Sequence, residues 1–215
     1  MTFWDYAVLA DEDLPAIAET AKKLGLDGLC LLAGKPEVPD SVTDIAAGVL
    51  IEASKPDDVR KLARKSRKSH EIIAVAGTEE SISRAAVETA EVDMLIPSGH
   101  TKIDITMAKL ARKNNVCIAF SFSQLLQSSL QDRGAVFAQM LKNAGMVIRA
   151  KAPFLIVSGA LSEYGLRSPS ELTAFGSLLG FSGKDVRDAL SARLIEENRK
   201  RLSKGWVMPG VEVEQ

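Results

Sequence analysis

The 215-residue sequence has few of the side chains that usually carry catalysis or bind metals. It contains two cysteines and two histidines, whereas a metal-dependent hydrolase needs several His, Asp and Glu ligands on one site. Two cysteines make no disulfide framework, and Cys30 and Cys117 each lie inside an apolar run, which favours buried, reduced thiols in a cytoplasmic protein. We therefore predict no catalytic residue and no metal ligand in this chain.

Several general signals are also missing. The sequence contains neither a G-x-G-x-x-G motif nor a Walker A motif, so a dinucleotide-binding sheet is disfavoured. Its apolar runs are far too short to span a bilayer, and the first 18 residues contain four acids and no Lys or Arg, unlike a signal peptide. Aromatic residues make up 5%, which does not indicate stacking of single-stranded bases. These absences predict a protein that does not enter the membrane.

Charged residues, by contrast, are numerous and unevenly placed. Lys and Arg number 27 against 28 Asp and Glu, so the formal net charge of −1 argues against a protein that is basic all over. Residues 1–58 carry twelve acids and four lysines, a net charge of −8, and residues 59–215 carry 16 acids and 23 bases, a net charge of +7. The division indicates a dipolar surface, although solvated helix faces that cluster by chance would give the same counts.

Short apolar runs alternate with longer amphipathic segments along the chain. Most runs do not alternate in polarity, which is typical of parallel strands buried on both faces. The seven runs are Trp4–Leu9, Gly28–Leu32, Ala46–Ile51, Ile72–Ala76, Met94–Ile96, Cys117–Phe120 and Phe154–Val157. We predict a single α/β domain over residues 1–215, a compact TIM-like (β/α) barrel of about seven parallel strands, with 205–215 as a possible tail. An open doubly wound sheet is the alternative.

Helical periodicity fills the segments between these runs. Apolar residues recur at three- and four-residue steps over 14–24, 59–63, 82–90, 105–111 and 136–148. Ser168-Pro169-Ser170-Glu171 is typical of a capping box with proline at the first helical position. Helices over these ranges suit the crossovers that parallel strands require.

The two histidines lie at opposite ends of the predicted barrel. His70 precedes the fourth strand, at the end where a barrel has no catalytic site, and is interpreted as a surface residue. His100 follows the fifth strand, at the end where active sites form, and is placed to join Asp5, Glu52 or Asp104 in a weak site. A single loop histidine is more often only a polar surface residue, and the sequence leaves both interpretations open.

Basic residues gather in three dense clusters. The first is Arg60, Lys61, Arg64, Lys65, Arg67 and Lys68; the second is Lys109, Arg112 and Lys113; the third is Arg193, Arg199, Lys200, Arg201 and Lys204. Positions three and four residues apart share one helix face, from which Lys and Arg can neutralise the phosphates of a structured RNA. Amphipathic helices also expose lysines and arginines that bind nothing, so solvated faces are the alternative.

The carboxyl-terminal half contains a more specific pattern. Residues 154–160 read Phe-Leu-Ile-Val-Ser-Gly-Ala, and residues 166–172 read Leu-Arg-Ser-Pro-Ser-Glu-Leu. Asn198-Arg199-x-Arg201-Leu202 and Val92-Asp93-Met94-Leu95 add to it. With these motifs the chain resembles ribonuclease P protein component 3, a family found in archaea with eukaryotic relatives, over nearly its whole length. One departure is Ile96-Pro97-Ser98-Gly99-His100, where family members often have Ser-His-Pro.

The barrel of that family is similar to the polymerase-and-histidinol-phosphatase fold, whose first strand carries Asp-Leu-His-x-His. The corresponding stretch here is Asp5-Tyr6-Ala7-Val8-Leu9, so Ala7 and Leu9 occupy both metal-ligand histidine positions. This substitution agrees with the small number of candidate catalytic residues.

The resemblance implies a subunit of ribonuclease P, the ribonucleoprotein that removes the 5′ leader from precursor tRNA. In that family the RNA subunit and its Mg²⁺ ions carry the chemistry, so the chain itself would bind no cofactor. The protein would stabilise the folded catalytic RNA together with protein component 2, as a two-plus-two heterotetramer.

The residues expected to contact RNA come from the basic clusters and from the loop after the seventh strand. Ser158 and Gly159 are expected to offer backbone N–H groups to phosphate, and Arg167 to add a charge near a helix amino terminus. A tight turn of small residues and a structural ion pair are the alternatives at these positions. The full predicted set is Arg60, Arg64, Lys65, Lys68, Lys109, Arg112, Lys113, Ser158, Gly159, Arg167, Arg199 and Arg201.

Two other functions stay open at this point. A metal-dependent phosphoesterase of the polymerase-and-histidinol-phosphatase type would use the same barrel and His100. A scaffold protein that binds only its protein partner would leave the basic clusters solvated.

Overall fold

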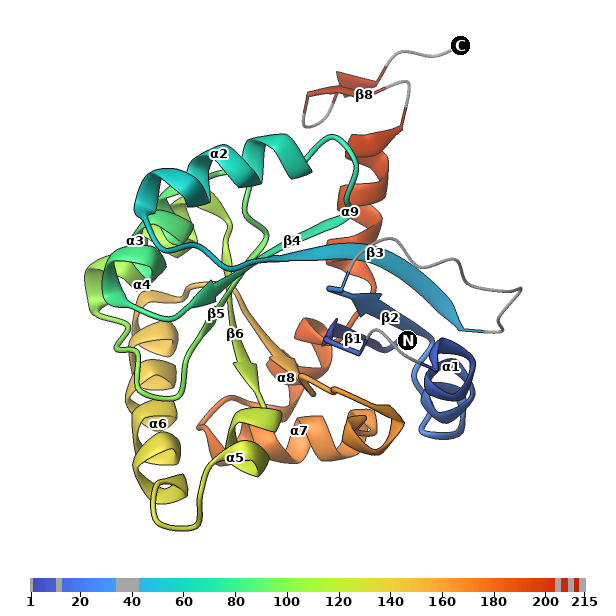
Figure 1. Ribbon diagram of the computed structural model, residues 1–215, viewed down its shortest axis with the longest axis vertical. Coiled ribbons are helices and arrows are strands. Elements are labelled where there is room, and N and C mark those ends of the chain that lie inside the picture. The colour runs from blue at the N-terminus through green and yellow to red at the C-terminus, as the bar shows by residue number, and fades with distance from the viewer. Residues whose placement is uncertain (1, 11–12, 34–42, 204–205, 209–210, 213–215) are drawn as a thin grey trace.

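Seven parallel strands lie side by side in chain order at the centre of the molecule (Figure 1). The computed structural model describes residues 2–10, 13–33, 43–203, 206–208 and 211–212. The strands are β1 (Trp4–Val8), β2 (Gly28–Leu31), β3 (Asp44–Ile51), β4 (Ile72–Gly77), β5 (Met94–Pro97), β6 (Cys117–Ser121) and β7 (Phe154–Val157). All seven predicted runs are therefore strands, and the prediction of an α/β fold is confirmed.

The sheet curves until its last strand meets its first. Val8 and Ala160 form a parallel bridge, Leu9 N donates to Ala160 O at 2.7 Å, and Gly159 N donates to Ala7 O at 3.0 Å. These bonds come mostly from residues just beyond β7, so the barrel is nearly closed. The TIM-like barrel is confirmed, and the open doubly wound sheet is wrong.

Helices follow β1, β3, β4, β5, β6 and β7 and cover the outside of the barrel (Figure 1). Helices confirm the predicted ranges at α1 (Leu14–Lys23), α2 (Pro56–Ser66), α3 (Glu80–Glu88), α4 (Ile105–Asn114), α6 (Arg133–Ala150) and α7 (Pro169–Leu178). The capping box at Ser168 and Glu171 is present at the start of α7. Periodicity did not reveal α5 (Ser123–Gln127), the 3₁₀ turn η1 (Glu163–Gly165) or α8 (Gly183–Ala189), because such short helices show too few turns to repeat.

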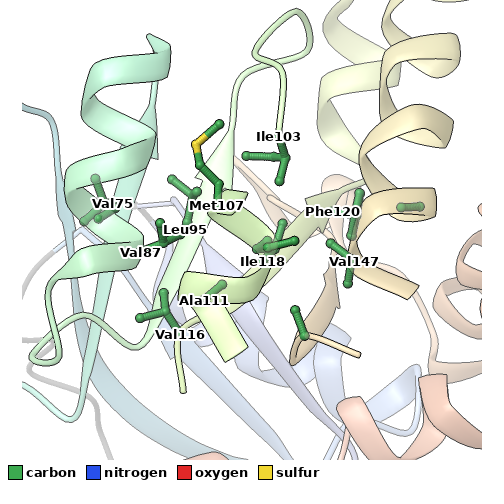
Figure 2. Packing of buried hydrophobic residues seen from close by; sticks show 14 of the residues in the cluster. Val75, Val87, Leu95, Ile103, Met107, Ala111, Val116, Ile118, Phe120 and Val147 are labelled. Carbon is green, nitrogen blue, oxygen red and sulfur yellow. The ribbon is translucent and has the colours of Figure 1, made fainter. Parts of the chain in front are cut away.

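Each strand buries side chains on both of its faces. Ile73 and Val75 of β4 pack outward in the same cluster as helix residues, whereas Ile72 and Ala74 pack inside the barrel. Figure 2 shows the outer layer, where Leu95 of β5 lies near Met107 of α4. Burial on both faces explains why the strands appear in the sequence as continuous apolar runs.

The last long helix, α9 (Arg193–Leu202), covers the amino end of the barrel. Ile195 packs in the same cluster as the barrel residues Trp4 and Tyr6. Tyr6 Oη donates to Ser191 O at 2.6 Å, which ties the start of the helix to β1. The bottom of the barrel is therefore closed by the chain's own carboxyl-terminal region.

The predicted tail, 205–215, lies partly outside the described residues. Its described part contains β8 (Trp206–Met208) and β9 (Val211–Glu212), which pair antiparallel. In the part of the chain that the structure describes, no helix is long and apolar enough to cross a membrane.

A carboxyl group is buried within the barrel. Asp5 of β1 has no exposed surface, and its Oδ1 accepts hydrogen bonds from Ser158 N at 3.1 Å and Ala7 N at 3.3 Å. Burial raises the pKa of Asp5 from its ordinary value of 3.8 to about 6, and the hydrogen bonds from Ser158 and Ala7 oppose that rise only in part. Asp5 thus links β1 to the loop that closes the barrel while retaining its proton in weak acid.

The free energy of unfolding is expected to fall as pH rises from about 4 to about 6, because the folded chain keeps a proton on Asp5 that the unfolded chain has released. The loss attributable to Asp5 is on the order of 3 kcal/mol. Urea unfolding of the wild-type chain and of Asp5→Asn across this pH range isolates the effect, since the variant cannot ionise there. Parallel pH profiles for the two chains would contradict the prediction.

Candidate nucleic-acid interface at the amino end of the barrel

Basic side chains gather where the helices end. A helix that connects parallel strands ends beside the amino ends of those strands, and its dipole favours cations in its last turn. Basic residues occupy the last turns of α1, α2, α4, α6 and α9, namely Lys22, Lys23, Arg64, Lys65, Arg112, Lys113, Arg149, Arg199, Lys200 and Arg201. The amino end of the barrel therefore carries most of the predicted basic clusters.

Arg67, just after α2, forms a buried ion pair with Asp93, which directly precedes β5. Arg67 Nη2 also donates to Glu91 O at 2.8 Å, and Asp93 Oδ2 accepts from Ile73 N at 2.7 Å. From the opposite side, Arg201 Nη2 lies 3.5 Å from Asp93 Oδ1. One buried carboxylate thus joins α2, α9 and β4, and Arg201 is part of that network.

Arg199 joins α9 to the starts of two strands. Its Nη1 and Nη2 donate to the Asp44 carboxylate at 2.6 and 2.8 Å, and its Nε donates to Glu71 Oε1 at 2.6 Å. The guanidinium also lies over the Trp4 ring, with 5.4 Å from Cζ to the ring centroid. The structure therefore places Arg199 in a bidentate structural contact, although the sequence indicated an RNA contact.

Three further arginines of the first two clusters link neighbouring helices and loops. Arg60 contacts Asp57 at 2.9 Å and Glu88 of α3 at 3.2 Å. Arg64 reaches Glu91 at 3.4 Å but leaves 71% of its side chain exposed. Arg112 Nη1 donates to the Ala150 carbonyl at the end of α6 at 3.3 Å. These contacts hold α2 against α3 and α4 against α6.

The lysines of the predicted set, unlike most of the arginines, have no ion-pair partner among the described residues. Lys65, Lys68, Lys109 and Lys113 are all exposed, and none of them forms an ion pair with any residue that the structure describes. Lys65 and Lys68 lie one turn apart at the end of α2, and Lys113 lies at the end of α4. Their charges face solvent at the amino end and are available to an anionic partner.

The loop after β7 does not join this surface, because it lies at the carboxyl end of the barrel. Ser158 N donates to Asp5 and Gly159 N donates to Ala7, and both residues are buried. The prediction that these N–H groups bind phosphate is therefore wrong, since barrel closure already uses them. Gly159 has φ +65°, and an added Cβ would lie 2.1 Å from Ser121 Oγ, so a tight turn explains the glycine.

Arg167 also lies at the carboxyl end. Its Nη1 donates to the carbonyls of Leu166 at 2.6 Å and Tyr164 at 3.0 Å, and its Cζ lies 5.1 Å from the centre of the Phe122 ring. These contacts hold two loops together at the carboxyl end of the barrel. Arg167 therefore lies at the opposite end from the exposed lysines.

The mouth of the barrel at this end contains a cavity of about 190 Å³. Its wall combines apolar residues such as Ala7 and Leu9 with hydroxyl and amide side chains such as Ser121 and Gln124, and none of the described residues that line it is charged. Such a wall offers no carboxylate or imidazole to a metal or a water molecule.

The structure separates His100 from its predicted partners. His100 Nε2 lies 2.9 Å from Asp132 Oδ2 at an exposed position. Asp104 instead caps α4, accepting from Met107 N at 2.6 Å, and pairs with Arg84. Within the described ranges, no three His, Cys, Asp or Glu side chains come together in a way that would hold a metal ion.

Comparison with known families identifies the chain. The model of the RNase P subunit p30 family matches residues 3–203. The chain belongs to the RNase P subunit p30 family. Ribonuclease P protein component 3 of Methanococcoides burtonii is 34% identical to this p30-family chain over 204 residues, covering 90% of the chain and 84% of the relative. The corresponding protein of Methanosarcina mazei is 29% identical over 229 residues, covering 98% and 95%.

Solved structures share the barrel of this p30-family chain. A chain in the cryo-EM structure of archaeal ribonuclease P with mature tRNA superposes with a TM-score of 0.84, 22% identity and 98% coverage of both chains. Histidinol phosphate phosphatase of Lactococcus lactis superposes with a TM-score of 0.53, 9% identity and coverage of 85% and 97%. The fold is thus common to both, whereas the family match favours the ribonuclease P assignment over the phosphoesterase alternative.

Sequence reasoning found the basic residues but missed which of them are paired. One signal was available: Asp93 stands directly before the apolar run of β5, and Glu71 directly before that of β4. An acid at the edge of a buried strand needs a partner, and the arginines of α2 and α9 provide it.

Replacing Arg67 by alanine is expected to lower the free energy of unfolding by about 3 to 5 kcal/mol, because Asp93 would remain buried without its main partner. The two side chains are only 12% and 5% exposed. Lys68→Ala, at the next position, is the matched control and should change stability by less than about 0.5 kcal/mol. Equal effects in urea unfolding would show that Arg67 is not a structural anchor.

Proposed function

We propose that this chain works as a protein subunit of ribonuclease P, the endoribonuclease particle that removes the 5′ leader from precursor tRNA. The observation that carries this proposal is the match of the RNase P subunit p30 family to residues 3–203. The RNA of the particle and its Mg²⁺ ions carry the chemistry, and this chain contributes no catalytic group and binds no cofactor of its own. The particle acts in the cytoplasm.

The exposed lysines at the amino end of the barrel would neutralise phosphates of the RNA. Lys65 and Lys113 lie in the last turns of α2 and α4, Lys68 follows α2, and Lys109 lies in the middle of α4. None of the four has an ion-pair partner among the described residues. Lysines held near RNA phosphates lower the repulsion between close-packed strands and replace condensed cations. The folded catalytic RNA then needs less Mg²⁺ when the protein is bound.

Protein component 2 completes the working unit, as a two-plus-two heterotetramer with this chain. The formal net charge of −1 supports such a partnership, because a subunit with one basic end binds RNA more strongly when a companion adds further contacts. A scaffold that binds only component 2 is the competing role, and its association with the particle would not depend on salt.

Removing two of the exposed lysines, as Lys65→Gln with Lys68→Gln, is expected to raise the Mg²⁺ concentration for half-maximal cleavage about twofold or more. The variant should be assayed in the particle reconstituted with the RNA and component 2. Lys102→Gln with Lys142→Gln removes the same charge from exposed positions away from the helix ends and should leave the Mg²⁺ requirement unchanged. An unchanged requirement in both variants would argue against RNA contact by α2.

The purified chain alone is expected to cleave no RNA and no phosphate ester, because the described residues that line its barrel mouth include no charged group. Adding it to the RNA together with component 2 should raise the rate of precursor tRNA cleavage, and omitting it should lower that rate. Metal-dependent hydrolysis by the chain alone, lost in a His100→Ala variant, would overturn the proposal in favour of a phosphoesterase.

A further inference from the structure

A second cavity opens at the amino end of the barrel, on the same end as the exposed lysines. Its volume is about 220 Å³. It lies beneath the starts of β6 and β7, against the turn between α8 and α9, and its apolar wall includes Pro153, Phe154 and Leu194. The proposed function does not use it.

The cavity is built from fixed groups. The Phe154 ring stacks on Phe181 with 3.8 Å between ring centroids and 13° between planes. Asn115, which caps α4 in the left-handed conformation with φ 56°, forms part of the rim. Arg112 bonds to the Ala150 carbonyl and so holds the ends of α4 and α6 together beside it. The walls therefore need little rearrangement to accept a ligand.

The polar groups of the lining include donors, such as Arg193 and Asn115, and two carboxylates, Asp188 and Glu197. Arg193 and Glu197 neutralise each other across 2.9 Å, and Cys117 stays neutral because burial raises the pKa of its thiol to about 12. The Asp188 carboxylate lies exposed on the rim and forms no ion pair within the described chain. The lining is thus mixed polar and apolar and nearly neutral, with one carboxylate, Asp188, that forms no ion pair within the described chain.

Two lysines stand close to lining residues along the chain. Lys113 and Lys151 are exposed and unpaired among the residues that the structure describes, and each stands two residues before a residue of the lining, Asn115 and Pro153 respectively. The two lysines would repel a cationic side chain of a protein partner, and the Asp188 carboxylate would repel an acidic one. A ligand with a neutral tip and anionic groups next to it fits these charges best.

We propose that this cavity takes up a single unpaired base of an RNA that carries an exocyclic amino group, with its flanking phosphates on Lys113 and Lys151. This inference rests on the proposed function as a ribonuclease P subunit. The base plane lies against the apolar wall, and its amino group donates to the Asp188 carboxylate, as carboxylates accept from the cytosine amino group in other complexes. Uracil is disfavoured, because it has no exocyclic amino group and its single N3–H donor is flanked by two carbonyl oxygens that the carboxylate repels.

The test uses the particle reconstituted from ribonuclease P RNA, this chain and component 2. Dimethyl sulfate reports unpaired adenine and cytosine, kethoxal reports guanine, and a carbodiimide reports uracil. Ala189→Met fills the cavity, and Asp188→Ala removes its free carboxylate. In both variants one base that the wild-type chain protects should become about fivefold or more reactive, while the other protections that depend on this chain persist.

Exposed positions nearby supply matched controls. Ala174→Met on α7 and Asp185→Ala on α8 make the same chemical changes at exposed sites outside the cavity lining and should leave every protection in place. Thermal unfolding of each variant checks that it folds. If Ala189→Met does not fold, Asp188→Ala decides the matter, because its side chain is exposed.

Three results would overturn the base site. They are unchanged protections in both cavity variants, a change confined to uracil, and loss of component 2 binding with all RNA protections retained by the remaining complex. A wild-type chain that protects no nucleotide and does not stimulate cleavage would instead refute the proposed function itself, and the base site with it.

Discussion

The common direction of the seven strands constrains everything else in this molecule. Parallel neighbours require each connecting helix to run backwards, so every such helix ends at the amino end of the barrel. Helix dipoles favour cations there, and the chain places basic residues in the last turns of α2 and α4. One basic end therefore arises in a protein whose formal net charge is −1.

Arginine and lysine have different roles at the amino end of the barrel. A guanidinium presents several donors in one plane and suits carboxylates that are partly buried, whereas an ammonium is a compact, strongly hydrated charge. Arg67, Arg199 and Arg201 accordingly contact Asp93, Asp44 and Glu71 and hold α9 against the barrel. Lys65, Lys68 and Lys113 form no ion pair with any residue that the structure describes, and the arginines keep the helices that carry them in place. Loss of the arginine contacts would thus displace the lysines without touching them.

Several features were predictable from the sequence, and others were not. Buried parallel strands produce apolar runs, so all seven strands were found, and the Ser168 capping box located the start of α7. The pairing of Arg199 with Asp44 could not be predicted, because the two residues are 155 positions apart in the sequence. Ser158 and Gly159 were misjudged for the same reason, since their N–H groups meet partners on β1 only when the barrel closes.

By itself the sequence determined the alternation of strands and helices, the family, and the number and kind of charges along each helix. Those properties depend on residue order over a few turns, where periodicity, capping and motif spacing act. Only the tertiary structure decided which cations are free, which backbone groups are already bonded, and where cavities remain between strand and helix ends. These outcomes depend on contacts between distant segments, and barrel closure alone brings those segments together.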